Sequence, residues 1–192
     1  MGRTLRRTLL TSELLEAACV RADALPIFQN SHRKKQANLV GCIGEIVFEN
    51  FLTQNHIPFK DCRNTTKYDY LVGKGRFSLD LKTKDRTVKP ELFHDNSVPL
   101  YNHEHQRPSY YFFVSLHRDR RINVEDIRRF KTAYLVGGID IDTLDHEGRR
   151  WNAGDVDPDN GTKFWTACLN VNMEKLPTCE QMLKIFRGDT VT

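Results

Sequence analysis

The side chains with the clearest chemical potential lie within residues 68–84. Two runs of alternating polar and apolar residues flank Gly73-Lys74-Gly75, which is typical of a β-hairpin with a short turn. A two-residue turn at 74–75 places Asp69 directly opposite Asp80. Two carboxylates in that arrangement lie roughly 5 Å apart at Cβ and destabilise a sheet unless something positive lies between them. The pairing therefore predicts a divalent metal ion, helped by Lys82.

The second arm of this hairpin carries charge on one of its two faces. Alternation along a strand puts Phe77, Leu79 and Leu81 on one side. The other side carries Ser78, Asp80, Lys82 and Lys84. The register is the critical assumption, because a turn longer by one residue would move Asp69 to the wrong face.

A predicted helix over residues 38–54 supplies two further acids. Its apolar residues leave only a narrow polar strip, which holds Glu45, Glu49 and Thr53. Gly41 and Gly44 in its first turns would permit close approach to a sheet. We therefore expect Glu45 to lie close to the sheet, with Glu49, one turn along the same strip, as its rival.

Taken in order, these segments resemble the PD-(D/E)XK nuclease superfamily. The resemblance covers roughly residues 38–116 and rests on Gly-Cys-Ile-Gly-Glu45 on a helix, Tyr-Asp69 on one strand and Asp80-Leu-Lys82 on the next. It implies an α/β, restriction-endonuclease-like αβββαβ core with a mixed central sheet flanked by helices. Tyr68 replaces the proline of the motif, and the acid before Leu-Lys82 is Asp, but neither change removes a ligand type.

The resemblance also implies metal-dependent hydrolysis of phosphodiester bonds. Asp69 and Asp80 would bind Mg²⁺ or Mn²⁺, with the backbone carbonyl of Leu81 as a third ligand, and Glu45 would reach the metal directly or through water. The metal acidifies bound water, and Lys82 would orient or help deprotonate that water and offset charge in the transition state.

The expected substrate is DNA. A net charge of +4 and a pI near 8.8 favour a polyanionic partner. No separate recognition domain fits in this length, so selection of a DNA end or structure is favoured over a long base sequence. The sequence leaves open whether the protein forms a homodimer. The candidate backbone contacts are Arg33, Lys34, Lys35, Lys74, Arg76, Lys84 and Arg86.

Several other interpretations of these residues stay open. The same chemistry on RNA is one, and a non-catalytic nucleic-acid-binding or assembly protein is another. In a third interpretation, Asp69 and Asp80 are exposed acids on an edge hairpin, and Lys82 or Lys67 neutralises their charge. His94, His103 and His105, with Glu104, would hold a structural zinc ion in a fourth, although exposed polar loop residues are favoured there.

The acidic run at Asp155, Asp157 and Asp159 is similar to a calcium-binding loop. Asn160 stands where such a loop needs glycine, and Thr166 stands where it needs glutamate. A turn over residues 158–161 is therefore the preferred interpretation.

Composition favours one globular domain, with 39% hydrophobic and 28% charged residues. Five scattered cysteines without a Cys-x-x-Cys pair indicate a reduced, intracellular protein. Glu13 and Glu16 interrupt any signal-peptide core, and no run of about 18 apolar residues occurs, so a cytoplasmic protein without a membrane segment is expected.

Within that single domain we expect an N-terminal arm and helix over 1–36, a catalytic core over 38–140 and a C-terminal hairpin and helix over 141–192. The remaining expected elements are a loose basic arm over 1–11, a helix with its N-cap at Ser12, strands at 59–62, 110–116 and 133–139, a long polar loop over 85–108, a helix over 124–131, a hairpin from 150–156 and 162–171, and a helix over 179–186.

Overall fold

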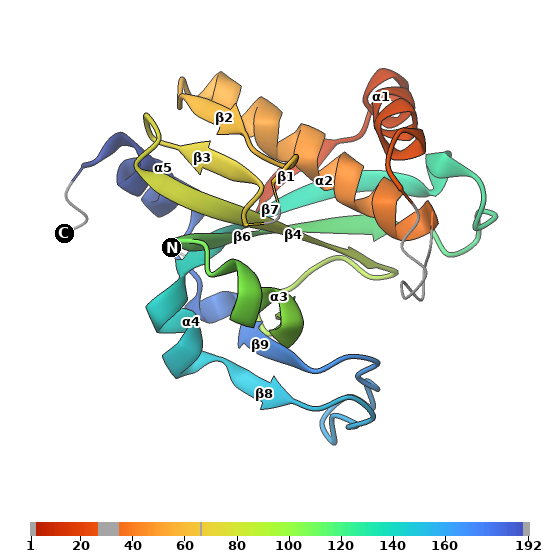
Figure 1. Ribbon diagram of the computed structural model, residues 1–192. Helices are drawn as coiled ribbons and strands as arrows, with labels where there is room; N and C mark the ends of the chain where they lie inside the picture. Colours follow the sequence, from red (N-terminus) through yellow and green to blue (C-terminus); the bar gives the residue numbers. More distant parts are fainter. Residues whose placement is uncertain (1–2, 27–34, 66, 190–192) are drawn as a thin grey trace. The chain divides into compact units, whose positions relative to one another are not determined.

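The structure is a computed structural model that describes residues 3–26, 35–65 and 67–189. Over these ranges the chain is an α/β protein with a mixed six-stranded sheet, containing one parallel pair, and a small antiparallel sheet (Figure 1). The larger sheet has the order β1-β7-β6-β4-β3-β2, and the smaller has the order β5-β9-β8.

The helices of the described ranges are α1 (Ser12–Asp23), α2 (Lys35–Gln54), α3 (Leu100–Gln106), α4 (Ile141–Glu147) and α5 (Cys179–Arg187). The strands are β1 (Arg6–Leu9), β2 (Phe59–Asp61), β3 (Tyr70–Val72), β4 (Phe77–Arg86), β5 (Asp95–Pro99), β6 (Tyr110–Arg118), β7 (Phe130–Asp140), β8 (Arg149–Trp151) and β9 (Cys168–Asn172). Within the same ranges, no helix is both long enough and apolar enough to cross a membrane.

The segments group into two compact units. Unit 1 combines Met1–Ile57, Leu81–Pro90 and Phe113–Val136. Unit 2 combines Pro58–Asp80, Glu91–Phe112 and Gly137–Thr192. Strand β4 begins in unit 2 and ends in unit 1.

The first strand and first helix of unit 1 correct two predictions. The prediction of a loose arm is wrong for Arg6–Leu9, because these residues form β1. This strand pairs antiparallel with β7 and places Arg6 opposite Leu135. Helix α1 begins as predicted, but its N-cap is Thr11, whose hydroxyl accepts a hydrogen bond from the Leu14 N–H at 3.3 Å. The β1 pairing depends on a partner more than 120 residues away, which no local pattern reveals.

Helix α2 confirms the strongest helical prediction and begins three residues earlier, at Lys35. Its apolar face is buried, as the sequence periodicity requires, and α1 packs against it within unit 1. The buried residues of this face are Val40, Cys42, Ile43, Val47, Phe48, Phe51 and Leu52.

The hairpin of unit 2 forms with the predicted register. Tyr70 lies opposite Leu79 and Val72 lies opposite Phe77. The turn is centred on Lys74 and Gly75 as predicted, because the Arg76 N–H donates to the Gly73 carbonyl at 3.4 Å and both central residues have positive φ angles, of 61° and 77°. The predicted strand at 59–62 is confirmed as β2.

The long polar loop predicted over 85–108 is wrong. It contains strand β5 and helix α3, and β5 pairs antiparallel with β9, with Asp95 opposite Asn172. The partner strand lies far along the chain, so short-range sequence signals could not show it.

The helix predicted over 124–131 is also wrong. A short 3-10 turn at Ile127–Arg129 precedes β7, which starts at Phe130 and includes the strand predicted at 133–139. The pairing of β7 with β1 begins at Thr132, beyond the end of the predicted helix. The strand predicted at 110–116 is confirmed as β6.

The C-terminal part of unit 2 is largely as predicted. β8 and β9 pair antiparallel with Trp151 opposite Cys168, and the intervening arms are joined by a bridge between Val156 and Lys163 and by further backbone hydrogen bonds, one of them from the Asp157 N–H to the Thr162 carbonyl at 2.9 Å. Helix α5 is confirmed and begins with a capping box between Thr178 and Gln181. Helix α4 was not predicted.

Candidate functional site

The predicted pairing of Asp69 with Asp80 is replaced by a bulge one residue beyond the regular ladder. The Asp69 N–H donates to the Leu79 carbonyl at 3.0 Å, although Leu79 already lies opposite Tyr70. The Asp69 carbonyl accepts from the Cys62 N–H at 2.8 Å on the other side. Two residues of one strand thus oppose one residue of its partner, which defines a β-bulge. The two acids lie at adjacent positions of neighbouring strands, but strand alternation no longer sets the direction of the Asp69 side chain.

Asp80 is an interior acid. Its residue is only 2% exposed, and β4 lies between β6 and β3 in the larger sheet. The interpretation of Asp80 as an exposed acid on an edge hairpin is therefore wrong. Asp69 is half-buried.

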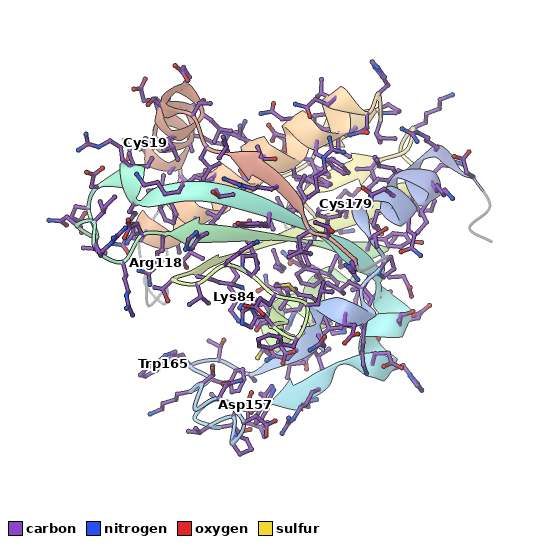
Figure 2. All side chains as sticks on the ribbon, turned by 180° about the vertical axis from the view of Figure 1, so that it is seen from behind. Cys19, Lys84, Arg118, Asp157, Trp165 and Cys179 are labelled. Carbon is purple, nitrogen blue, oxygen red and sulfur yellow. The ribbon has the colours of Figure 1, made fainter. Side chains whose placement is uncertain are left out.

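Strand β4 continues past Asp80 with two more residues of the same face. β4 runs without interruption from Phe77 to Arg86, so alternate residues Asp80, Lys82 and Lys84 share one side of it. Lys82 and Lys84 are half-buried, and Figure 2 labels Lys84 on this strand. Leu81, whose carbonyl was predicted as a ligand, is buried on the opposite side.

At the far end of β4, in unit 1, charged residues are held by strand β6. Arg118 Nε donates to Asp85 Oδ2 at 2.7 Å, and the Asp85 side chain is 3% exposed. Arg86 Nε donates to Ser115 Oγ at 3.3 Å. Hydrogen bonds to side chains of β6 therefore hold Asp85 and Arg86 in place at this end of β4.

Glu45 and Glu49 of α2 both meet Arg21 of α1 inside unit 1. Arg21 forms two hydrogen bonds with Glu49, Nη1 to Oε1 at 2.8 Å and Nη2 to Oε2 at 2.9 Å. Its distance to Glu45 Oε2 is longer, at 3.5 Å. The two predicted rivals thus differ, because Glu49 forms the tight paired contact with Arg21. Glu45 as a metal ligand stays a prediction.

One of the two helix glycines allows α2 to approach β4. A Cβ on Gly44 would lie 1.9 Å from Thr83 Oγ1, so only glycine fits, and Glu45 is the next residue. No atom lies within 4 Å of a Cβ at Gly41. The prediction of close approach is confirmed at Gly44 and wrong at Gly41.

The predicted DNA-backbone contacts outside β4 divide into three groups. Arg76 uses its guanidinium within unit 2, where Nε donates to Gly73 O at 3.0 Å and Nη2 donates to Phe186 O at 3.1 Å. Lys74 is exposed at the tip of the hairpin. Arg33 and Lys34 lie outside the described residues, and Lys35 is described only as the first residue of α2.

His103 belongs to a buried polar cluster that the sequence did not predict. It is 3% exposed, so the expectation of an exposed loop residue is wrong. Its Nδ1 lies 3.2 Å from Tyr111 Oη, and its Nε2 contacts Asp145 Oδ1. Arg107 Nη2 donates to Asp145 Oδ2 at 2.8 Å. The members come from three elements up to 42 residues apart, so no short motif could have revealed them.

The electrostatics of this cluster extend to Asp80, which is part of the same unit. Burial raises the pKa of the Tyr111 phenol well above its usual range, and the negative charge of Asp80 raises it further. Hydrogen bonding from Arg107 lowers the pKa of Asp145. Tyr111 is therefore a neutral phenol, and Asp145 is a carboxylate.

The remaining predicted clusters have local partners. His94 Nδ1 accepts from the Glu91 N–H at 3.0 Å, and His105 Nδ1 lies 2.8 Å from Tyr101 O. Asp157, labelled in Figure 2, accepts from the Asp159 N–H at 3.0 Å and Asn160 Nδ2 at 2.7 Å. The acidic run therefore forms a turn closed by its own groups.

Metal-ligand geometry and cysteine pairing complete the description of the site. Among the residues that the structure describes, no three His, Cys, Asp or Glu side chains are grouped so that they could hold a metal ion. All five cysteines lie in the described ranges, and none forms a disulfide.

Comparison with protein-family models, with curated proteins and with solved structures finds no match to this chain.

Proposed function

We propose that the chain is a divalent-metal-dependent nuclease that hydrolyses DNA phosphodiester bonds with a PD-(D/E)XK type of site. The observation that carries the proposal is Asp80, an acid buried in an interior strand, followed on the same face by Lys82 and flanked on the neighbouring strand by Asp69 at a bulge. Bulges are over-represented next to active sites, where they re-aim a side chain.

The order of elements supports the same proposal. Helix α2 is followed by the three strands β2, β3 and β4, and then by helix α3 and strand β6, with β5 inserted before α3. In the larger sheet β6 is the neighbour of β4. This is the αβββαβ order expected of the restriction-endonuclease-like fold.

The donor set fits a hard divalent cation. Asp69, Asp80 and the Leu81 carbonyl offer only oxygen ligands, which Mg²⁺ and Mn²⁺ prefer. In this proposal the ion binds at the Asp80 carboxylate, whose residue is 2% exposed. Bound there, the ion would acidify a water molecule and neutralise phosphate charge.

The other residues of the strand have separate tasks in this proposal. Lys82 orients the attacking water and offsets charge that develops on the phosphate in the transition state. Lys84, farther along the same face, contacts a backbone phosphate and contributes to binding without reading sequence.

Cleavage by matched variants tests the proposal. Wild-type protein, Asp80→Asn and the control Asp61→Asn would be incubated with labelled single-stranded, duplex and branched DNA and with RNA, in Mg²⁺ or Mn²⁺. Asp61 is a half-exposed acid of β2 paired with Arg63. We expect the wild type and Asp61→Asn to cleave DNA, and Asp80→Asn to bind it without cleaving.

Two results of this panel would replace the proposal. Cleavage confined to RNA would assign the same chemistry to the other nucleic acid. Binding without cleavage of any substrate by the wild type would favour a binding or assembly protein on a nuclease-like scaffold.

A further inference from the structure

Trp165 presents a large aromatic ring to solvent on the arm that links β8 to β9 in unit 2. The residue is 66% exposed, and Figure 2 labels it at the outer edge of this arm. Large aromatic side chains dominate the energetics of cores and interfaces, and this ring is not part of the core. Its exposure therefore points to a binding role.

The arm holds Trp165 in a defined direction. The Phe164 N–H donates to the Asp155 carbonyl at 2.9 Å, and the Phe164 carbonyl accepts from the Gly154 N–H at 2.7 Å. The buried Phe164 ring stacks on Trp151, with 4.6 Å between the ring centroids. Since successive side chains of an extended segment point to opposite sides, burial of Phe164 directs Trp165 outward. The exposed ring is thus positioned before any partner binds, which lowers the entropic cost of binding.

A lysine accompanies the exposed ring. Lys163 Nζ lies 5.0 Å from the centroid of the Trp165 ring, and Lys163 is itself exposed. A cation over one face of an indole ring is attracted by the ring's electrons. A partner that stacks on this ring therefore meets a positive charge beside it.

The acids of the same arm have partners within the arm. Asp155 Oδ2 accepts from the Asn152 N–H at 2.7 Å, and Arg149 Nη1 lies 3.8 Å from Asp159 Oδ2. Asp157 is 4% exposed and closes the turn described above. Lys163 therefore sets the sign of the charge beside Trp165, and that sign favours an anionic partner.

A second exposed ring lies on the segment next to this arm. The Leu100 N–H donates to the Ala167 carbonyl at 2.9 Å, which joins the start of α3 to the chain two residues after Trp165. Tyr101, the residue after Leu100, is 73% exposed, and its ring centroid lies 4.5 Å from that of His105. Two exposed aromatic rings thus lie on neighbouring segments of unit 2.

Exposed aromatic rings beside a cation are suited to unpaired nucleobases. Every base has a flat aromatic face, and the adjoining phosphate is an anion, so one single strand satisfies both the rings and the lysine. Inside a duplex the same faces are covered by the neighbouring bases. A ring on a rigid arm therefore reaches them only on a single strand or where two strands separate.

We infer that Trp165 and Tyr101 bind single-stranded DNA by stacking on its bases, with Lys163 contacting a neighbouring phosphate. The inference deepens the proposed function, because it names the form of DNA that the nuclease selects, and it rests on that proposal for the choice of DNA. Stacking needs no metal ion, so it is measured separately from cleavage.

Substitution by leucine separates stacking from simple apolar contact. Trp165→Leu and Tyr101→Leu keep an apolar side chain at each position and remove the ring. Phe93→Leu is the matched control, because Phe93 is also 66% exposed but lies beyond the opposite end of β5, where Asp95 pairs with Asn172. Fluorescence polarisation of a labelled oligothymidylate, with EDTA present to prevent cleavage, measures the affinity of each variant.

The expected losses follow from the stacking and charge of the strand. Trp165→Leu should weaken binding of the oligothymidylate about tenfold and Tyr101→Leu about fivefold, as loss of one stacked base does. Lys163→Gln should lower the slope of the logarithm of the binding constant against the logarithm of salt concentration by about 0.7. Phe93→Leu should bind like the wild type.

Tryptophan fluorescence reports the contact itself. The chain has two tryptophans, and Trp151 is only 7% exposed, so quenching by DNA reports on Trp165. Oligothymidylate should quench the fluorescence of the wild-type protein and leave that of Trp165→Leu unchanged.

Three results would overturn the inference. They are equal single-strand binding by the wild type and Trp165→Leu, no quenching of the wild type by the oligonucleotide, and quenching that appears only as the protein concentration rises. The last result would make a second copy of the chain the occupant of this surface. An unchanged affinity of Tyr101→Leu would remove that ring from the surface.

Failure of the proposed function gives a different result. Wild-type protein that binds single strands with quenching but cleaves no DNA in Mg²⁺ or Mn²⁺ would overturn the nuclease and support the stacking surface. Cleavage of DNA without any quenching would support the nuclease and overturn the stacking surface.

Discussion

Two sets of acids in this molecule are held in different ways. In unit 1, Glu49 and Glu45 of α2 share the guanidinium of Arg21 as an ion-pair partner. In unit 2, Asp80 lies in the interior of the larger sheet and is 2% exposed. The difference teaches that burial alone does not identify a reactive acid. A guanidinium partner gives the acids of α2 a role in the fold, whereas the role that we propose for Asp80 is to bind a divalent cation.

The largest expected effect concerns the two lysines that share a face with Asp80. Lys82→Met should lower kcat by about 10²–10⁴-fold, because the group that orients the attacking water and offsets charge in the transition state is lost. Lys84→Met should mainly weaken DNA binding and reduce its salt dependence. Single-turnover cleavage rates and binding measured at several salt concentrations separate the two. Equal losses of kcat in both variants would remove the special role of Lys82.

The approach of α2 to the sheet gives the next largest effect, on stability. Gly44→Ala should lower the free energy of unfolding by about 1–3 kcal/mol, since its Cβ would overlap Thr83. Gly41→Ala is the matched control and should raise it by up to about 1 kcal/mol, because alanine favours a helix and has open space there. Urea unfolding of the two variants measures both values, and similar behaviour would contradict the close packing at Gly44.

Replacing the acids of α2 one at a time sharpens the comparison further. Glu49→Gln should lower the free energy of unfolding by about 1–2 kcal/mol, because a partly buried Arg21 loses its paired hydrogen bonds. Glu45→Gln should cost less than half as much, given its longer contact. In cleavage assays the order should reverse, with the larger loss at Glu45. A larger loss of activity in Glu49→Gln than in Glu45→Gln would make Glu49, not Glu45, the candidate metal ligand.

The smallest effect is a pH dependence in unit 2. The Arg107 hydrogen bond lowers the pKa of Asp145 below its value in the unfolded chain, about 3.9. Asp145 therefore stabilises the fold above that value, and its contribution is lost as pH falls through the lower, folded pKa. Asp145→Asn should be less stable than the wild type at pH 7, with a difference that shrinks below about pH 4. Denaturant unfolding at several pH values measures it, with the exposed Asp142→Asn as control.

The sequence was informative where short-range patterns decide the structure. The apolar periodicity of α2 and the alternation of β3 and β4 are strong local signals, and both elements formed with the predicted faces. The turn centred on Lys74 and Gly75 also formed as predicted, with the Arg76 N–H donating to the Gly73 carbonyl.

The sequence failed where distant partners decide. β1 and β5 exist because β7 and β9 pair with them, and the polar residues around both gave no such indication. The bulge at Asp69 depends on which carbonyl accepts from its backbone N–H, and the alternation of polar and apolar side chains does not predict that. His103, Tyr111 and Asp145 meet only through the packing of three elements, so the cluster was visible only in the structure.

The most direct test of the central claim is a crystal structure of the protein with Mn²⁺, using anomalous diffraction to locate the metal. The account predicts an anomalous peak coordinated by the Asp80 carboxylate and the Leu81 carbonyl, with Asp69 as a further ligand. The peak should disappear in Asp80→Asn crystals treated in the same way. Mn²⁺ bound elsewhere with none at Asp80, or an unchanged peak in that variant, would contradict it.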